Sequence, residues 1–355
     1  MKKVAINALT ANPGGGLSVV RQFAQALASI GYEVDVFLGT ARSTKVMRKA
    51  GIKNVNVKLV LPWLPTYLRL LIGKFIFLAV GGYKVVITPN YHSFSRGKTI
   101  TLHVNLFSFM ENPDGSSVSE KLKRLDAGLA CRLSDVNIFE SGYIEGLAKE
   151  KKGPINNSQV LYMPISDDFY RKPEGPHIAK SEVVVISSPN KHKNNDVALR
   201  AFSIFREQHN RKDINLVFFG GQSASDWNEY QGMAAELSVE NNVLFEGPRS
   251  APELTERLNS ALCSMTCSSV ESFCMVAIES MAAYCPVVAS NATSMPESLG
   301  GAGVICKDRD PDSFAVGLGK MLDDDRRAAF VEKGIARASR FRMDVFSSQL
   351  EQLLD

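Results

Sequence analysis

The feature that most limits the fold of this chain is a regular alternation of short apolar runs with longer helical patterns. In the first half, strand-like runs occur at 3–9, 33–38, 56–61, 84–88, 98–103, 135–139 and 159–163, and a helical pattern follows the first run at 18–30. A second series has strand-like runs at 182–186, 215–219, 242–246, 262–266, 286–289 and 303–306. Its helical patterns lie near 195–208, 226–238, 252–260 and 273–283, and the chain is helical from 311 onward. Such alternation predicts parallel sheets, so we expect an α/β chain of two Rossmann-like, doubly wound domains facing a central cleft.

A polar stretch at 166–180 separates the two series and has the composition of a linker. We therefore expect an N-terminal domain at 1–165, a C-terminal domain at 166–340, and a terminal helix at 341–355 that packs back on the N-terminal domain. The 355 residues suffice for two such domains, each with a core of its own.

Composition limits the compartment and the partners. A net charge of +4 is too small to argue for nucleic-acid binding. The six cysteines lie scattered in apolar contexts, which favours buried free thiols over a disulfide framework or a zinc site. The apolar stretch after Met1 is too short for a secretory signal, so we expect a cytoplasmic protein.

One segment, 268–290, carries most of the functional information. It predicts a helix that is almost wholly apolar yet holds one carboxylate, Glu279, near its middle and another, Glu271, just before its start. A buried carboxylate without a partner costs several kcal/mol, and no Lys or Arg lies within a helical turn. A ligand rich in hydroxyl groups is therefore a candidate partner. The alternative is an N-terminal Glu favoured by the helix dipole plus a core Glu bonded to the backbone.

The spacing of this segment suits a nucleotide sugar. Eight residues of helix place the two carboxylates roughly 12 Å apart. Between them, the amides of Phe273, Cys274, Met275 and Val276 are expected to be free at a helix N-terminus, where a phosphate binds well. One carboxylate would take hydroxyls of the sugar, the amides the diphosphate, and the second carboxylate the ribose diol.

Three further groups follow predicted strands. A glycine loop, with Gly15 and Gly16, lets backbone approach a ligand at the start of the first helix, or is a plain turn. The basic loop 187–194, with Lys193, could neutralise a diphosphate, or is a solvated turn. His103 ends a strand and has either a structural or a catalytic role. Asp323, Asp324 and Asp325 indicate a helix cap rather than a metal site.

The pair Glu271 and Glu279, with Phe273 between them and the run 286–288 after the helix, resembles the E-x7-E signature of retaining GT-B glycosyltransferases of the family 4 type. Glu297 stands where that family often has another Glu, and Lys193 matches the family's Lys. The sequence departs from the family pattern where Gly is usual, at Ser272 and Cys274, and where Arg is usual, at Ser188.

The resemblance implies a GT-B fold, with an acceptor-side N-terminal domain and a nucleotide-sugar-binding C-terminal domain. It implies catalytic roles for Glu271, Lys193 and His103, and donor contacts from Gly15, Gly16, Lys193, Arg249, Glu271, Phe273, Cys274, Met275, Val276 and Glu279. The implied reaction moves a sugar from a GDP- or UDP-linked donor to a carbohydrate or lipid-linked acceptor, in synthesis of bacterial cell-surface polysaccharide or lipopolysaccharide. No cofactor and no metal are expected. The alternatives are a nucleotide-sugar epimerase or hydrolase of GT-B fold and a non-catalytic sugar-binding protein.

Residues 58–80 form the most hydrophobic long run, but two prolines, Arg69 and Lys74 interrupt it. The interruptions argue against a membrane-spanning helix. An ordinary core helix is one interpretation. The other is an amphipathic helix whose Trp63, Tyr67, Arg69 and Lys74 meet the inner face of the plasma membrane or a lipid-linked acceptor.

Overall fold

The computed structural model describes residues 2–110, 118–173, 181–221 and 224–354. The chain divides into two compact units, and each is described here by itself. Unit 1 comprises 1–164 and 343–355, and unit 2 comprises 165–342. The first part of the predicted linker contains a short 3-10 turn, Asp167–Tyr170, whereas 174–180 lie outside the described residues.

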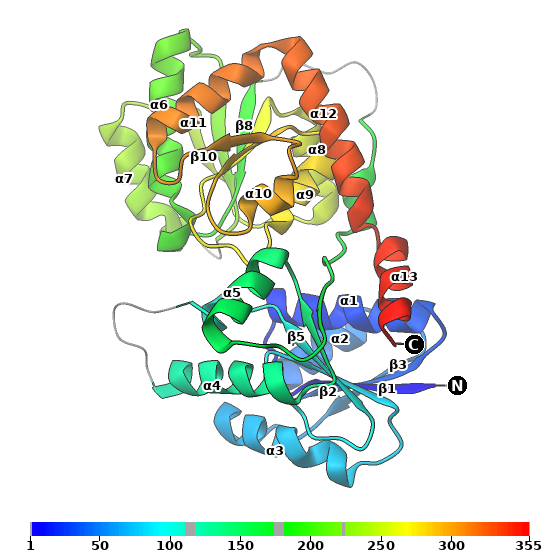
Figure 1. Cartoon of the computed structure of the whole chain (residues 1–355). Helices are drawn as coiled ribbons and strands as arrows, with labels where there is room; N and C mark the ends of the chain where they lie inside the picture. Colours follow the sequence, from blue (N-terminus) through cyan, green and yellow to red (C-terminus); the bar gives the residue numbers. More distant parts are fainter. Residues whose placement is uncertain (1, 111–117, 174–180, 222–223, 355) are drawn as a thin grey trace. The chain divides into compact units, whose positions relative to one another are not determined.

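Unit 1 contains a seven-stranded sheet in the order β3-β2-β1-β4-β5-β6-β7, with all paired neighbours parallel. In chain order the strands are β1 (Lys3–Ala8), β2 (Glu33–Leu38), β3 (Val55–Leu59), β4 (Val85–Pro89), β5 (Lys98–His103), β6 (Val136–Phe139) and β7 (Ser158–Val160). The helices between them are α1 (Gly15–Ser29), α2 (Ala41–Lys49), α3 (Thr66–Ala79), α4 (Val118–Leu133) and α5 (Gly142–Lys152). The order of strands reverses between β1 and β4. In Figure 1, α1 lies on one face of this sheet, and α3 and α4 lie on the opposite face.

The last helix, α13 (Met343–Leu354), belongs to unit 1 and packs on α1. Its Phe346 ring meets the Phe23 ring edge-on, with centroids 5.1 Å apart, and both side chains are buried. Lys98 also donates from Nζ to the backbone oxygen of Leu353 (3.0 Å). The end of the chain therefore completes the core of the first unit rather than that of the second.

Unit 2 contains a six-stranded parallel sheet in the order β10-β9-β8-β11-β12-β13. The strands are β8 (Glu182–Ile186), β9 (Asn215–Phe219), β10 (Val243–Phe245), β11 (Cys263–Thr266), β12 (Val287–Ser290) and β13 (Val304–Cys306). The helices are α6 (Asn195–His209), α7 (Asn228–Glu236), α8 (Ala251–Ser260), α9 (Met275–Ala282), α10 (Met295–Leu299), α11 (Pro311–Gly319) and α12 (Asp324–Ala338). Figure 1 shows α6, α7 and α11 on one face of the sheet and α8, α9 and α12 on the other.

The predicted fold class is confirmed, since both units are doubly wound, Rossmann-like α/β domains. The helices α2, α4, α5 and α10 were not predicted, and α9 begins at Met275, two residues after the predicted start at Phe273. Asp323 caps α12 by accepting from the backbone N–H of Arg326 (3.0 Å), as predicted for the acidic run. The six cysteines are all buried and free, also as predicted. Among the described residues, no helix is both long enough and apolar enough to cross a membrane.

Candidate functional site

The candidate site lies where the strand order of unit 2 reverses. The strands β8 and β11 pair in parallel, with Val183 opposite Cys263, although the chain runs outward through β9 and β10 between them. Open α/β sheets bind ligands outside the carboxyl ends of the strands at such a reversal. The basic loop 187–194 leaves β8 at this end, and the loop that carries Glu271 leaves β11 beside it.

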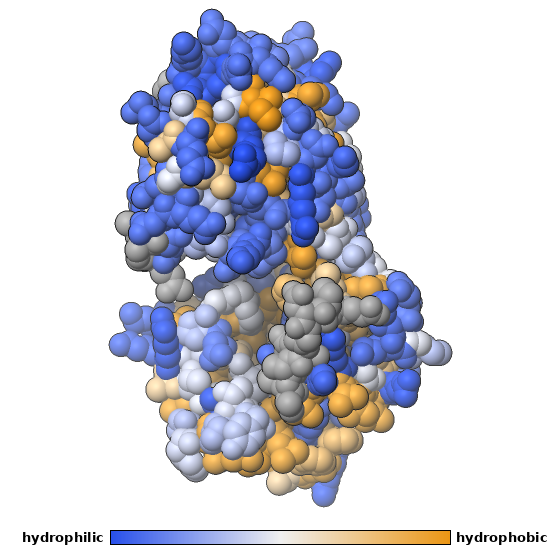
Figure 2. Space-filling view, turned by 90° about the vertical axis from the view of Figure 1, so that its left-hand side faces the viewer, coloured by the Kyte–Doolittle hydropathy of each residue, from blue (hydrophilic) through white to orange (hydrophobic). Residues whose placement is uncertain are grey.

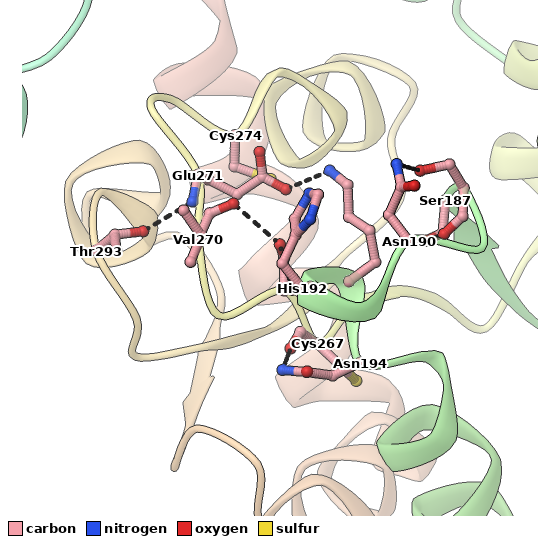
Figure 3. Close-up of polar contacts among 12 residues, drawn as sticks. Ser187, Asn190, His192, Asn194, Cys267, Val270, Glu271, Cys274 and Thr293 are labelled. Carbon is pink, nitrogen blue, oxygen red and sulfur yellow. Dashed lines mark hydrogen bonds and ion pairs between the residues drawn. The ribbon is translucent and has the colours of Figure 1, made fainter. Parts of the chain in front are cut away.

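Lys193 and Glu271 meet across these two loops. The Nζ atom of Lys193 lies 2.6 Å from Oε1 of Glu271, and the two side chains are 25% and 17% exposed. Figure 3 shows Glu271 beside the basic loop. The pair is thus accessible to a ligand but only partly hydrated. The structure brings together the two residues for which the resemblance implied catalytic roles in this domain.

Backbone contacts hold the two loops in register. Asn194 adopts a left-handed conformation (φ 49°), which Asn tolerates better than most residues. Its Nδ2 donates to the backbone oxygen of Cys267 (2.9 Å), as Figure 3 shows. The carbonyl of His192 accepts from the N–H of Ser269 (2.9 Å) and from Oγ of Ser268 (3.2 Å). Lys193 is therefore positioned by fixed neighbours on both sides.

Two hydroxyl residues after β12 fix the backbone of Glu271. Its N–H donates to Oγ1 of Thr293 (3.0 Å), and its carbonyl accepts from Oγ of Ser294 (2.9 Å). Neither residue was among the predicted site residues. A short polar run directly after a predicted strand could have indicated them. That inference would also have required the knowledge that β12 lies beside β11.

The predicted phosphate-binding site at the start of α9 needs a correction. The N–H of Cys274 donates to Oγ of Ser298 (3.1 Å), and the N–H of Met275 to the carbonyl of Phe273 (3.0 Å). These two amides are therefore not free, and the prediction was wrong for them. Phe273 is itself buried, with its ring centroid 5.5 Å from that of Phe341. Val276, at the second position of α9, is partly exposed.

Glu279 lies on the predicted helix, and its assignment to a ligand stays a prediction. It lies on α9, is partly buried, and has no hydrogen bond or ion pair from its carboxylate to any described residue. Burial raises the pKa of Glu279 to about 7. The spacing argument was wrong, however, because Glu271 lies before Met275, where α9 begins, so helical rise does not set the distance between the two carboxylates.

The remaining predicted residue of unit 2, Arg249, is not brought to Lys193. It follows β10, which β9 separates from β8, and its Nη2 lies 3.1 Å from Oε2 of Glu246. Ser188, at the position where Arg was usual, accepts from Nδ2 of Asn190 (2.9 Å). Lys191 of the basic loop is exposed and, unlike Lys193, forms no ion pair with a described residue.

The glycine loop of unit 1 follows β1, at the reversal between β1 and β4. Gly14 has φ 132°, a value that favours glycine, and precedes α1. A Cβ atom added to Gly15 or Gly16 would meet no atom within 4 Å. Packing therefore does not explain these two glycines, and their backbone remains open to approach.

His103 needs a second correction. Its side chain is 1% exposed, its Nε2 donates to Oδ1 of Asn137 (2.8 Å), and its ring stacks on that of Phe139 at 4.5 Å. Burial lowers the pKa of His103 to about 4, so the imidazole is neutral at pH 7. The structure favours the structural interpretation of His103 over the catalytic one.

No group of three or more His, Cys, Asp or Glu that could hold a metal ion occurs within the described ranges. The chemistry available in this part of unit 2 is thus a cation paired with a carboxylate, Lys193 with Glu271, and the unpaired carboxylate of Glu279 in the middle of α9.

Comparison with known proteins agrees with this arrangement. Residues 166–337, nearly half of the chain, match the family model of glycosyl transferases group 1. Two curated relatives are the D-inositol 3-phosphate glycosyltransferases of Acidothermus cellulolyticus (34% identity) and Corynebacterium jeikeium (32%). The first match covers 43% of this chain and the second 46%, and they span only 36% and 40% of those relatives. The match supports the predicted glycosyltransferase class for this domain.

Solved structures extend the likeness in fold to the whole chain. Sucrose-phosphate synthase from Thermosynechococcus elongatus gives a TM-score of 0.79 at 17% identity, covering 99% of this chain and 98% of that one. The Anabaena protein HepE, solved with UDP, gives 0.80 at 18% identity, covering 100% and 99%. At these identities the likeness shows the GT-B fold alone.

Proposed function

We propose that this chain is a glycosyltransferase that takes a sugar from a nucleoside diphosphate donor bound at the carboxyl ends of β8 and β11. One observation carries the proposal: the Lys193–Glu271 pair stands at the strand reversal of the domain that matches glycosyl transferases group 1. A cation and a carboxylate in contact can serve the two parts of such a donor, its charged diphosphate and its sugar hydroxyls.

The reaction breaks the bond between the sugar's anomeric carbon and a diphosphate oxygen, and that oxygen keeps the electron pair. A bond then forms between the anomeric carbon and an acceptor hydroxyl oxygen. In the retaining mechanism proposed here, the leaving diphosphate accepts the hydroxyl's proton on the same face of the sugar. Lys193 stabilises the charge that grows on the diphosphate. Glu271 holds Lys193 and accepts from a sugar hydroxyl.

We further propose that Glu279 accepts from the two hydroxyls of the donor's ribose. The partly buried carboxylate has no partner among the described residues, and burial raises its pKa. Two hydroxyl donors would supply the hydrogen bonds that favour the ionised form. The amide of Val276 and the side chain of Lys191 are the nearest remaining candidates in sequence for further contact with the diphosphate.

The donor base and the acceptor are proposed by class. UDP is the first nucleotide to test, because the HepE structure was solved with it, and GDP is the second. Carbohydrate and lipid-linked acceptors, as in cell-surface polysaccharide synthesis, remain the proposed classes. The relatives named for inositol 3-phosphate add a polyol phosphate as a candidate acceptor. No metal or other cofactor is part of the proposal.

The decisive experiment measures binding first and products second. Titration calorimetry with UDP, GDP and their glucose and mannose conjugates should identify one nucleotide that binds wild type and binds Glu279→Ala more weakly. Glu332→Gln, at an exposed position on α12, is the control and should bind as wild type does.

Products are then analysed with and without each acceptor. Turnover that needs an acceptor supports transfer, and sugar release or epimerisation without one supports the alternative enzymes. Binding without any turnover would indicate a non-catalytic sugar-binding protein.

A further inference from the structure

Charge is distributed very unevenly along unit 1. Residues 36–110 contain 11 Lys and Arg but no Asp or Glu, whereas the whole chain has 41 basic and 37 acidic residues. A block of 75 residues with a single sign of charge attracts an anionic surface and repels another copy of itself. The helix α3, with the run before it, lies inside this block.

The outer face of α3 is apolar and exposed. Large hydrophobic side chains on it, just before it and just after it are exposed by 38–76%: Trp63, Tyr67, Leu71, Ile72, Phe75, Leu78 and Val80. Figure 2 shows apolar residues gathered along the lower edge of unit 1, where Figure 1 places α3. The inner face holds Gly73 and Phe77, which are buried. The two interpretations of this segment therefore apply to opposite faces of one helix.

The basic residues expected to contact a membrane are not available for it. Arg69 is buried and donates to the carbonyl of Gly39 and to Oγ1 of Thr66 (3.1 Å). Lys74 forms an ion pair with Asp126 of α4. The prediction that Arg69 and Lys74 meet the lipid was wrong, because both side chains hold α3 to its neighbours.

That ion pair joins two apolar stripes. On α3, Leu71 and Leu78 lie three residues before and four residues after Lys74, so they occupy the same side of the helix. On α4, Leu122 and Leu129 lie four before and three after Asp126 in the same way. The exposed leucines of α4 are Leu122, Leu125, Leu129 and Leu133. The stripes therefore meet edge to edge along the Lys74–Asp126 pair and form one surface, called here the α3–α4 face.

Exposed basic side chains accompany the α3–α4 face. Lys121, Lys123 and Arg132 are exposed on α4, and Lys84 and Arg96 are exposed in the segments after α3. An apolar face with basic neighbours and with Trp and Tyr at one end has the composition of an interfacial membrane-binding surface. A second copy of the chain would bring like charges together, so a lipid surface fits better than a self-association interface.

We propose that the α3–α4 face docks unit 1 on a bilayer surface that contains anionic lipid. Leu71, Phe75 and Leu125 enter the boundary between headgroups and acyl chains, and the surrounding Lys and Arg contact anionic headgroups. The proposal stands on unit 1 alone. It therefore does not depend on the donor site proposed in unit 2.

Vesicle cosedimentation of the full chain tests this proposal. Wild type should sediment with phosphatidylcholine vesicles containing 30% phosphatidylglycerol, and less so at 0.5 M salt because the headgroup attraction is screened. Leu71→Glu and Leu125→Glu should each reduce the partition coefficient of the protein onto these vesicles about tenfold. Each change removes the contact of a Leu side chain with lipid and places a negative charge in the interface. Val316→Glu is the matched control, because Val316 on α11 is 55% exposed, as is Leu71.

Four outcomes would overturn the proposal. The first two are that wild type ignores anionic vesicles at low salt, or that it binds neutral and anionic vesicles equally. The third is that Leu71→Glu and Leu125→Glu bind as Val316→Glu does. The fourth is that sedimentation without lipid shows a wild-type dimer that these two variants abolish, which would assign the face to a second copy. Melting temperatures and nucleotide affinities of the variants, expected to match wild type, separate a docking defect from misfolding and from failure of the proposed activity.

Discussion

The Nζ atom of Lys193 lies 2.6 Å from Oε1 of Glu271, across two loops that leave adjacent strands of unit 2. Because the two residues are 78 positions apart, the contact exists only through the pairing of β8 with β11. Contacts to Asn194, Thr293 and Ser294 hold the backbone on both sides. The charges are therefore positioned before any ligand arrives, which lowers the cost of ordering them during a reaction.

Lys193→Ala should reduce kcat about 100-fold or more while changing the donor KM by much less, because the charge that Lys193 stabilises grows in the transition state. Steady-state kinetics with a saturating acceptor would measure both values. The control is Lys333→Ala, at an exposed position on α12, which should leave both unchanged. A change confined to KM would show that Lys193 is a plain binding contact.

Glu271→Gln should lose most turnover yet bind the free nucleoside diphosphate within about 0.5 kcal/mol of wild type. The amide oxygen can still accept from Lys193, whereas the negative charge that attracts sugar hydroxyls is gone. Calorimetry with the nucleotide and with the intact donor separates the two effects. Equal loss of affinity for both ligands would place Glu271 on the nucleotide instead of on the sugar.

Activity should persist in excess EDTA, because the proposed mechanism stabilises the diphosphate with Lys193, assisted by the Val276 amide and Lys191, and uses no metal ion. The measurement is the initial rate before and after dialysis against chelator, followed by addition of Mg²⁺ or Mn²⁺. Loss that either metal restores would contradict the proposal. An unchanged rate would leave Lys193 as the main charge stabiliser.

The sequence predicted the sheets well, because parallel strands are buried on both faces and form distinct apolar runs. The runs at Glu33–Leu38, Lys98–His103, Glu182–Ile186 and Asn215–Phe219 match the observed strands to the residue. Short helices such as α2 and α10 were missed, since they have only nine and five residues and are too short for a clear apolar periodicity.

The site was predicted only in part. The unpaired Glu279 followed from the lack of nearby cations in the sequence. The hydrogen bonds from Glu271 to Thr293 and from Arg69 to Gly39 join residues 22 and 30 positions apart, and local patterns do not reveal such pairs. The burial of His103 depends on β6, which supplies both Asn137 and Phe139.

Stability should depend on pH through Glu279. Burial raises the pKa of Glu279 from 4.5 to about 7, so between these values the folded chain holds a proton that the unfolded chain has released. The contribution of this group to stability is therefore greatest below pH 4.5, falls as the pH rises to about 7, and is constant above that. Glu279→Gln should remove the fall, a difference of roughly 1–2 kcal/mol after allowance for partial exposure.

Urea unfolding at pH 5 and pH 8 would measure this difference for wild type, Glu279→Gln and the control Glu332→Gln. The control should follow wild type, since Glu332 is exposed. If wild type and Glu279→Gln changed in parallel between the two pH values, the carboxyl would have its ordinary pKa. Its environment would then be as hydrated as that of a surface residue.

The affinity for nucleotide should also depend on the ionisation of Glu279. If the ribose diol donates to ionised Glu279, affinity for the nucleoside diphosphate should rise as the pH increases through about 7, because the protonated carboxyl accepts more weakly. Glu279→Ala should bind about 1.5–3 kcal/mol more weakly at pH 8 and lose this part of the pH dependence.

Calorimetry between pH 6 and 8.5, with the nucleoside monophosphate as a second ligand, would measure both effects. The monophosphate keeps the ribose, so its affinity should change with pH in the same way. If the diphosphate alone responded, the titrating group would act on the phosphates and the ribose assignment for Glu279 would fail.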